Sequence, residues 1–439
     1  MNAVVIAVIV MLVLSLARLN VVVSLIIGAL LGGIVGGLSL SQTIEVFSGG
    51  LGNSAEVALS YALLGSFAVA ISRTGLPEAL VNAALKIVGK NGETKRKSLS
   101  KVAIILILLI MSVFSQNVIP IHIAFIPILV PPLLLVFNQL QLDRRLIASV
   151  ITFGLITPYM LLPTGFGAIF HDIVQTNMGE SGLTIAREDI PVAMIIPSIG
   201  MLVGLLIAVF FSYRNKREYD NISITEETKQ ESYTASGLIF AGISIVASLV
   251  VQLSTDSMIL GALAGIVIVA LSGKVKWKDT DTVLTNGMRM MSFIGFVMLA
   301  ASGFANVMKE TGHVDLLVEQ ASNLLNGNQQ LGILMMLLVG LLVTMGIGSS
   351  FSTIPIIATI FVPLSLELGL SPLATIAIIG TAGALGDAGS PASDSTLGPT
   401  SGLNADGQHN HIWDTCVPTF LHYNILLIVF GWLAAAVVL

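Results

Sequence analysis

Long apolar segments follow one another along almost the whole chain, and only short polar stretches separate them. A helix needs roughly 20 predominantly apolar residues to cross the hydrocarbon core of a bilayer. Only 10% of the 439 residues are charged, whereas a soluble domain carries about 25%. So few charges cannot cover a water-exposed surface, which excludes a cytosolic enzyme, a nucleic-acid-binding protein and a disordered scaffold. The sequence therefore predicts an all-α polytopic membrane protein.

Two apolar stretches, 102–138 and 331–370, are too long for one helix, and polar residues interrupt each of them. We predict that each forms a helical hairpin, with 115–117 at the tip of the first and 349–353 at the tip of the second. About ten further segments are predicted to cross the membrane as single spans. These are 2–17, 21–38, 57–73, 146–166, 191–213, 236–253, 258–272, 283–306, 372–398 and 418–438.

The basic residues predict the sidedness, because cytoplasmic loops are enriched in Lys and Arg. The basic clusters lie at 86–101, 144–145, 214–229 and 274–278. Because the first two flank 102–138 on the same side, that hairpin is predicted to be re-entrant from the cytoplasm. The second hairpin would then be re-entrant from outside, with the loop 168–190 and both termini also outside. The expected location is the cytoplasmic (inner) membrane.

The two halves of the chain resemble each other in the order of their elements. Segment 43–75 aligns without gaps on 280–312, and both end in Thr-Gly. Each half continues with an amphipathic stretch, a hairpin and a broken span. The enrichment of Lys and Arg in cytoplasmic loops gives the two halves opposite orientations in the membrane. Inverted repeats with interrupted helices at matching positions are typical of secondary transporters. We predict a first repeat over 1–212, a cytoplasmic linker over 213–235 and a second repeat over 236–439.

Polar residues at membrane depth gather at the two hairpin tips and in two Gly/Pro-broken spans, 154–167 and 383–398. Such backbone is tolerated only where it is buried or lines a cavity. Broken helices expose partial charges at their ends, and hydroxyl and amide oxygens suit a hard cation such as Na⁺. The predicted substrate or ion cavity contains Ser115, Gln116, Asn117, His122, Thr157, Pro163, Thr164, Gly165, Ser350, Ser352 and Thr353.

Asp387 and Asp394 are the only acids in the second broken span. A carboxylate inside a membrane protein is costly and is therefore a candidate functional group. The alternative is a short loop with two solvated acids. We predict that both acids bind Na⁺ or H⁺ in competition, and that serines of the same break support them. The predicted coupling residues are Asp387, Asp394, Ser390, Ser393 and Ser395.

Residues 386–396 read Gly-Asp-Ala-Gly-Ser-Pro-Ala-Ser-Asp-Ser-Thr. They resemble the signature of the NhaC-type sodium/proton antiporter family, part of the wider ion-transporter superfamily. The segment from Asp406 to His411 and the later Pro418 are also similar to that family. The resemblance implies Na⁺/H⁺ exchange, with Na⁺ or H⁺ as coupling ion and no other cofactor. Two positions depart from it: Ala388 replaces a bulkier, often ionisable residue, and the first half lacks a matching acid.

Other functions stay open beside Na⁺/H⁺ exchange. One is Na⁺- or H⁺-coupled import of a small amino acid, histidine-like or carboxylate-bearing. A channel is disfavoured by the broken helices, and an intramembrane enzyme has only the two aspartates as a candidate dyad, without Gly-x-Ser-x-Gly or His-Glu-x-x-His. His409 and His411 are a weak metal pattern, so we predict no metal other than Na⁺. Expected partners are the bilayer and a small solute or cation; a homodimer is an open alternative, and the single Cys416 excludes an internal disulfide.

Overall fold

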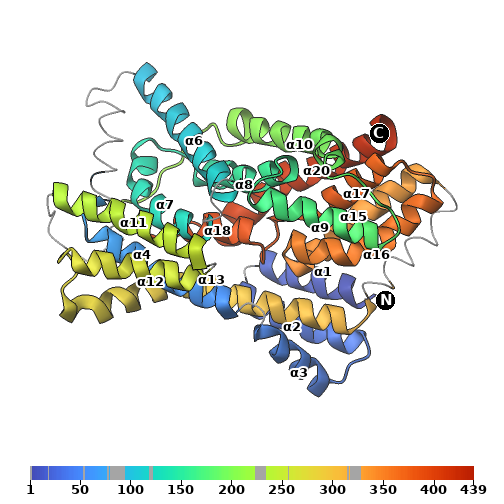
Figure 1. The fold of residues 1–439 in the computed structure, drawn as a ribbon, viewed down its shortest axis with the longest axis horizontal. Coiled ribbons are helices and arrows are strands. Elements are labelled where there is room, and N and C mark those ends of the chain that lie inside the picture. Colours follow the sequence, from blue (N-terminus) through green and yellow to red (C-terminus); the bar gives the residue numbers. More distant parts are fainter. Residues whose placement is uncertain are drawn as a thin grey trace.

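The structure is a computed structural model of the 439-residue chain, and it is almost entirely helical (Figure 1). The side chains of Asn117, His122 and Ser352 lie outside the described part, so their predicted cavity roles cannot be placed. The residues that the structure describes are 2–17, 19–52, 55–76, 94–117, 122–222, 234–255, 257–313 and 328–439, with the isolated Ala79 and Leu316.

The helices of the first half end at the central polar segment, and those of the second half begin after it. The first half contains α1 (Ala3–Leu16), α2 (Val21–Val35), α3 (Leu40–Leu51), α4 (Ala55–Ser72), α6 (Thr94–Asn117), α7 (His122–Gln139), α8 (Arg144–Leu161), α9 (Phe166–Glu180), α10 (Asp189–Ile207) and η2 (Ala208–Ser212). The second half contains α11 (Ala235–Thr255), α12 (Met258–Leu271), η3 (Trp277–Asp279), α13 (Thr280–Glu310), α15 (Gln329–Ile347), α16 (Ser350–Glu367), α17 (Pro372–Ala384), β1 (Leu385–Gly386), β2 (Ala388–Gly389), α18 (Asp394–Leu403), η4 (His411–Cys416), α19 (Val417–Thr419), η5 (Phe420–Asn424), α20 (Ile425–Leu433) and η6 (Ala434–Val438).

Five helical segments of the described part are long and apolar enough to cross a membrane. The pair α8 and α9, bent by 48° at a short break, would make a sixth. Seven further apolar helices are shorter, with 10–17 residues. The predicted count of about ten crossings and the re-entrant course of the two hairpins stay predictions. The five long segments are 189–212, 235–252, 291–310, 329–347 and 411–438.

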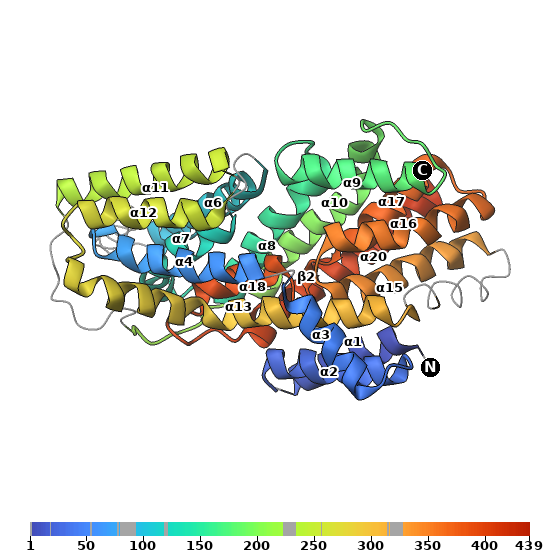
Figure 2. The same cartoon turned by 60° about the horizontal axis from the view of Figure 1, so that its bottom comes forward.

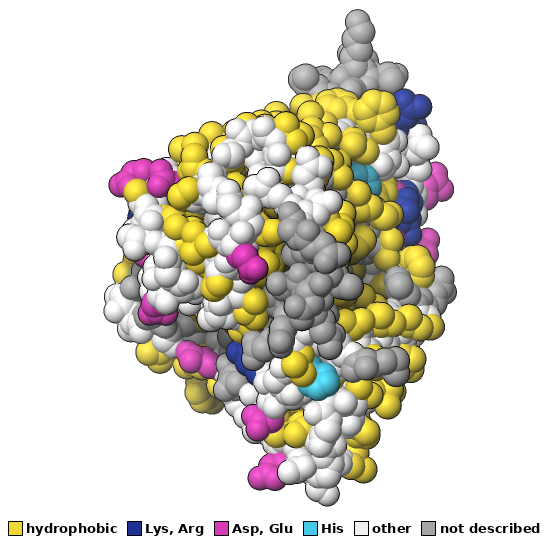
Figure 3. All heavy atoms as spheres, turned by 90° about the vertical axis from the view of Figure 1, so that its right-hand side faces the viewer, with side chains coloured by type: hydrophobic (Ala, Val, Ile, Leu, Met, Phe, Trp, Pro, Cys, Tyr) yellow, Lys and Arg dark blue, Asp and Glu magenta, His cyan; other side chains and the backbone are white. Residues whose placement is uncertain are grey.

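Apolar side chains face outward along whole helices. On α11, four exposed residues recur at helical spacing, and Ile239 and Val246 are each 60% exposed. On α10, a similar exposed stripe runs from Val192 to Leu206. Figure 3 shows hydrophobic side chains along the upper and right-hand parts of one end of the molecule, with only a few charged groups among them. Continuous apolar faces of this kind are compatible with lipid and not with water.

Three predicted boundaries are wrong. The loop predicted over 168–190 begins as α9, which packs against α16 and buries Phe170 and His171. Apolar residues four positions apart in α9 give it a buried face, which the polar residues between them obscured. The first break lies at 162–165, since α8 stays helical through Pro158. The last span begins at His411 instead of 418, because Asn410 caps the helix there, its side chain accepting from the N–H of Trp413 at 2.9 Å. Pro418 lies inside the continuous segment 411–438.

Two groups of helices meet around α18, which lies near the middle of the molecule in both ribbon views (Figures 1 and 2). In the first group α13 packs along α4, and α2, α3 and α12 pack beside them. In the second group α8, α10, α17 and α20 pack together. The helix α18 contacts α7 and α8 and also reaches α13. The break before α18 lies against α15, α17 and η5, beside the second group.

Glycines allow α13 to approach α3 and α4 closely. A Cβ added to Gly65 would lie 2.4 Å from the carbonyl oxygen of Gly287, and one added to Gly287 would lie 2.2 Å from Cα of Ser66. A Cβ on Gly50 would lie 2.9 Å from the carbonyl oxygen of Ser302. In lipid the hydrophobic effect does not drive helices together, and small residues at such crossings allow the close van der Waals packing that does.

Candidate functional site

The second break replaces helix by a buried, unwound segment over 385–393. Its two short strands, β1 and β2, pair in parallel with each other. Gly386 and Gly389 have φ values of 92° and 83°, a backbone conformation that favours glycine. At Gly386 an added Cβ would also lie 2.8 Å from the backbone nitrogen of Met345. The sharp turn therefore requires these glycines, and it brings the break against the end of α15.

Side chains from neighbouring helices bond the backbone of the unwound segment. Asn424 donates to the carbonyl of Ala388 at 2.6 Å, and Thr396 donates to the carbonyl of Ser390 at 2.5 Å. The hydroxyl of Ser390 donates to the carbonyl of Met345 at 3.1 Å. Buried backbone groups that leave a helix need such partners. Ser390, predicted as a cation ligand, thus also ties the break to the second hairpin.

Asp387 lies at the centre of the break and is 6% exposed. Its carboxylate accepts a hydrogen bond from the hydroxyl of Tyr159, a buried residue of α8. Ser350 directs both its backbone N–H and its hydroxyl toward the same carboxylate. Because Ser350 is the first residue of α16, the positive end of that helix also faces the carboxylate. Two elements distant in sequence, α8 and α16, therefore supply donors to one acid.

Asp394 has a different environment. It is the first residue of α18, next to the N-cap Ser393, whose hydroxyl accepts from the N–H of Ser395 at 3.1 Å. Its Oδ1 atom is buried and has no hydrogen-bond partner among the described residues. Tyr61 of α4 is near enough to interact with its charge, and the hydroxyl of Tyr61 is also without a partner there. Asp394 therefore offers a free carboxylate oxygen close to α4, a helix of the first group.

The remaining predicted residues lie in several places. Ser115 and Thr353 are buried, and their hydroxyls donate to carbonyls within their own hairpin arms. Gln116 Oε1 and Thr157 Oγ1 are buried and have no partner among the described residues. The carbonyl of Ser395 accepts from Thr152 at 3.0 Å.

In the first break, Gly165 takes a left-handed conformation at the start of α9. Pro163 and Thr164 beside it are exposed. No side-chain hydrogen bond joins either of them to the two acids among the described residues, so this break shares no cluster with the second one.

Tyr61 and Tyr159 are site residues that the sequence analysis missed. Both are fully buried within apolar helices, where a tyrosine hydroxyl usually finds a polar partner. That requirement is the signal that could have pointed to them, although it does not say which acid each one meets.

The oxygen-rich surroundings of the two acids suit a hard cation. Asp387 and Asp394 lie seven residues apart in the sequence, and a cation or a proton at either one would relieve the cost of burying its charge. The oxygens that could hold Na⁺ belong to Asp387, Asp394, Ser350 and Tyr61. Among the described residues, no group of three His, Cys, Asp or Glu side chains could hold a metal, so His409 and His411 gain no third ligand there.

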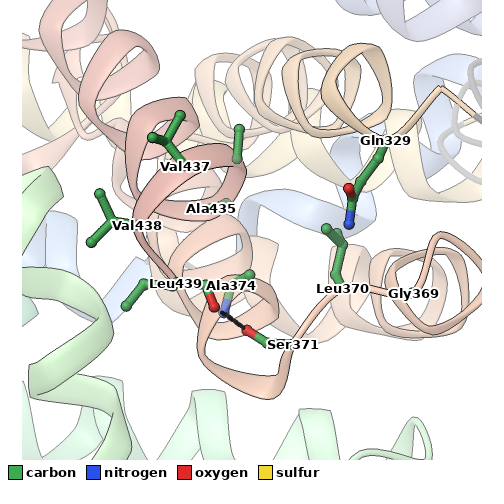
Figure 4. A pocket seen from close by; sticks show the side chains of 10 residues that line it. Gln329, Gly369, Leu370, Ser371, Ala374, Ala435, Val437, Val438 and Leu439 are labelled. Atoms are coloured by element: carbon green, nitrogen blue, oxygen red, sulfur yellow. Dashed lines mark hydrogen bonds between the residues drawn. The ribbon is translucent and has the colours of Figure 1, made fainter.

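Two cavities among the described residues are lined mainly by helices of the second half. The larger, of about 390 Å³, lies near the C-terminus, where Ser371 donates to the carbonyl of Leu439 at 2.9 Å (Figure 4). It contains none of the predicted site residues. A second cavity of about 280 Å³ is apolar and lies against Gly389, Pro391 and Cys416 of the second break and the last span.

A buried ion pair anchors the loop that follows α18. Arg144 is fully buried and makes two 2.6 Å hydrogen bonds to the carboxylate of Asp406, with a further bond to the carbonyl of Leu403. Burial opposes the charged form of Asp406, but the Arg144 guanidinium outweighs it and holds the pKa of Asp406 below its ordinary value. Residue Tyr219 of the central segment covers the guanidinium at 4.3 Å.

Full-length relatives are similar to this chain. The Bacillus subtilis protein YuiF, whose name describes it as a candidate amino acid transporter, is 58% identical over the full length of both chains. A membrane protein of Vibrio parahaemolyticus is 57% identical, also over both full lengths. A membrane protein of Haemophilus influenzae is 51% identical over 99% of each chain.

Two solved structures are similar at a lower level. The YdaH transporter of Alcanivorax borkumensis is 15% identical and covers 90% of this chain and 87% of its own, with a TM-score of 0.41. MtrF of Neisseria gonorrhoeae, described as one of a class of antimetabolite efflux pumps, is 14% identical and covers 91% and 84%, with a TM-score of 0.42.

Two family models match the chain. The model of the Na⁺/H⁺ antiporter family matches residues 150–432, and the model of a Na⁺-H⁺ antiporter family matches residues 2–88. The first match covers more than half of the chain and includes the second break and both of its acids. This chain therefore belongs to the Na⁺/H⁺ antiporter family of membrane transporters.

Proposed function

We propose that this protein is a cation-coupled secondary active transporter of the cytoplasmic membrane that exchanges Na⁺ for H⁺ by alternating access. The observation that carries the proposal is the pair of carboxylates at the second break, Asp387 on the unwound segment and Asp394 at the start of α18. Asp387 is held by several donors, whereas Asp394 keeps one oxygen free. The family implies Na⁺ and H⁺ as the coupling ions.

Competition between the two ions follows from the cost of a buried charge. A carboxylate enclosed in the membrane is stabilised by a proton or by a bound cation, and either one excludes the other. In this proposal Asp394 releases its proton when Na⁺ binds its free oxygen, and Asp387 completes the site from the other end of the break. Unwound segments and helix ends at the middle of the bilayer bind coupling ions in many transporters.

The position of the site favours alternating access. Asp394 belongs to α18, which packs on α8 of the second helix group. Tyr61 belongs to α4 of the first group and is near enough to interact with the charge of Asp394. An ion at Asp394 would therefore lie at the contact between two groups of helices. Movement of one group against the other would expose the ion to each side of the membrane in turn.

Packing of the glycines supports the proposed inverted repeat, 1–212 and 236–439, about the linker 213–235. In the alignment of 43–75 on 280–312, Gly50 corresponds to Gly287, and the pair 65–66 corresponds to 302–303. Gly50 packs against 302–303, and Gly287 packs against 65–66. Such reciprocal contacts are what a two-fold axis between the repeats would produce.

The experiment is flux in vesicles that contain the purified protein. An outward Na⁺ gradient should drive proton movement, measured with a pH-sensitive dye, in the wild type. Asp387→Asn and Asp394→Asn should each reduce this flux strongly while the protein still inserts. Flux near the wild-type level in both variants would mean that the acids lie in a solvated loop, and the proposal would be wrong.

A second candidate function is Na⁺- or H⁺-coupled uptake of a small amino acid. The observation that favours it is the 58% identity to YuiF. The same two acids would then bind the coupling ion, and the first-half polar residues would hold the solute. Uptake of labelled amino acids with and without a Na⁺ gradient distinguishes the candidates, because an exchanger of Na⁺ and H⁺ accumulates none of them.

A further inference from the structure

A chain of buried hydrogen-bonding groups joins the unwound segment to the loop after α18. His411 Nε2 lies 2.9 Å from the carbonyl oxygen of Pro391, and His411 Nδ1 lies 2.8 Å from Thr400 Oγ1. Thr400 Oγ1 lies 2.9 Å from Thr415 Oγ1, which lies 2.6 Å from His409 Nε2. The four side chains are at most 6% exposed.

The donor at the Pro391 end of this chain follows from the chemistry of its partner. A carbonyl oxygen only accepts, so His411 Nε2 carries the proton that is donated to Pro391. The Nδ1 atom of the neutral ring must then accept, and Thr400 is the hydroxyl within reach to donate to it. Thr400 has a single hydroxyl proton with three acceptors within reach: His411 Nδ1, the carbonyl of Thr396 at 2.9 Å and Thr415 Oγ1, to which it donates at 2.9 Å.

The opposite end of the chain agrees with this assignment. His409 Nδ1 is buried without a hydrogen-bond partner among the described residues. If Nε2 donates to Thr415, Nδ1 is an unprotonated acceptor, whereas the opposite tautomer would leave a buried N–H at Nδ1 without a partner among the described residues. Unpaired buried donors are the rarer case in proteins. His409 Nε2 is therefore the nitrogen that donates to Thr415.

We propose that His411 is a positioning residue that holds the Pro391 carbonyl, and with it the ion-binding shape of the unwound segment. This inference rests on the proposed function for its consequence, namely that the shape matters for cation binding. Pro391 lies between the two acids in sequence, four residues after Asp387 and three before Asp394. Without His411 the carbonyl would lose its donor, and the segment could turn the two carboxylates away from each other.

The far end of the chain is also anchored. The backbone N–H of His409 donates to Asn404 at 3.1 Å, and Arg144 holds the neighbouring Leu403 carbonyl and Asp406. The loop that carries both histidines is thus fixed to α8. The hydrogen-bond chain connects the ion-binding break with this ion pair, and it gives the family-like segment from Asp406 to His411 a structural role.

The first measurement is hydrogen–deuterium exchange of the amides over 385–393 in purified protein, which does not depend on transport. His411→Ala should speed exchange there about tenfold, the size expected for the loss of one hydrogen bond to a buried group. His411→Gln keeps an N–H that can donate to Pro391 and should change exchange by less than about threefold. Thr419→Val is the matched control, because the Thr419 hydroxyl bonds only to carbonyls of its own helix.

The second measurement is the dependence of flux on Na⁺ concentration. His411→Ala should raise the half-saturating Na⁺ concentration about tenfold and leave the maximal rate within about twofold, and Thr400→Val should shift the same parameter in the same direction by less. His411→Gln should restore most of the affinity with an unchanged pH profile. Since Gln carries no titratable proton, this rescue distinguishes positioning from proton transfer by the histidine.

The outcomes separate the two proposals. Unchanged exchange over 385–393 in His411→Ala, or a Gln variant as impaired as the Ala variant, would overturn the positioning role. If His411→Ala does not fold, the Gln and Thr400→Val variants decide the same question. A wild type without Na⁺-dependent flux would instead overturn the proposed function, and the exchange result on His411 would stand independently.

Discussion

The two helix breaks of this protein differ in burial and in chemistry. The second break, over 385–393, is buried at every position and lies next to two carboxylates. The first, over 162–165, bends α8 and α9 by 48° and exposes Leu162, Pro163 and Thr164. Both stretches are rich in the residues that end helices. The comparison teaches that such residues predict where a helix ends. Whether the break can form a binding site depends on whether it is buried.

The bonding of each break explains the difference. The second break receives donors from three elements, including Asn424 and Thr396, so its carbonyls remain satisfied without water. The first break is closed mainly by local bonds, such as the N–H of Gly167 to the carbonyl of Thr164 at 3.0 Å. An acid could be enclosed only where such external donors converge.

The largest effect is expected at Asp394. Asp394→Asn removes the charge that a proton or cation neutralises, and we expect coupled flux to fall at least about 100-fold, because no neutral oxygen replaces a carboxylate at a cation site. Flux at several pH values, normalised to inserted protein, measures this. Glu188→Gln, an exposed acid on the side of the first break, should retain wild-type flux. Equal losses in both variants would indicate a general electrostatic effect and contradict the comparison.

The next effect concerns stability. Asp406→Asn leaves Arg144 buried without a counter-charge, which should lower the free energy of unfolding by about 3–5 kcal/mol. The exposed pair of Asp172 with Arg187, near the first break, is the control, and Asp172→Asn should cost less than about 0.5 kcal/mol. Thermal unfolding in detergent compares the two variants.

The Asp406 variant also has an expected pH dependence. Because the pKa of Asp406 is lowered by Arg144, its contribution to stability is present above the unfolded-state pKa and is lost as the pH falls through the folded-state pKa. The stability difference between wild type and Asp406→Asn should therefore be constant near neutral pH and shrink below about pH 4. A difference that grows on acidification would show that the pair is not the cause.

A smaller effect is expected at Tyr159. Tyr159→Phe keeps the ring that packs on Phe170 at 5.0 Å but removes the hydroxyl that donates to Asp387. The half-saturating Na⁺ concentration should change about tenfold, as for one hydrogen bond to a charged group. Tyr423→Phe removes a buried hydroxyl that donates to the carbonyl of Ser149 at 2.6 Å. If this control alters Na⁺ affinity equally, Tyr159 has no specific role.

The smallest effect is expected at the first break. Thr164→Val changes an exposed side chain without a charge, and flux should stay within about twofold of the wild type. The same flux assay measures it. A loss comparable to that of Asp394→Asn would show that the first break belongs to the ion path after all, and the contrast between the two breaks would fail.

Much of the membrane architecture follows from local sequence. The apolar helices fall close to most predicted spans, as for α1 against 2–17 and α12 against 258–272. Where the prediction failed over 168–190, packing decided the outcome. The helix α9 was missed because its buried face is formed against α16, whereas the start of the last span at His411 is set locally by the Asn410 cap.

The sequence by itself determined the class of protein, the second break and its two acids, because the cost of charge in a membrane and the φ requirement of glycine act locally. It did not determine which groups meet those acids. Tyr159 is 228 positions from Asp387, and His411 is 20 from Pro391. A buried hydroxyl or imidazole requires some partner, but only the packing of distant helices selects which one.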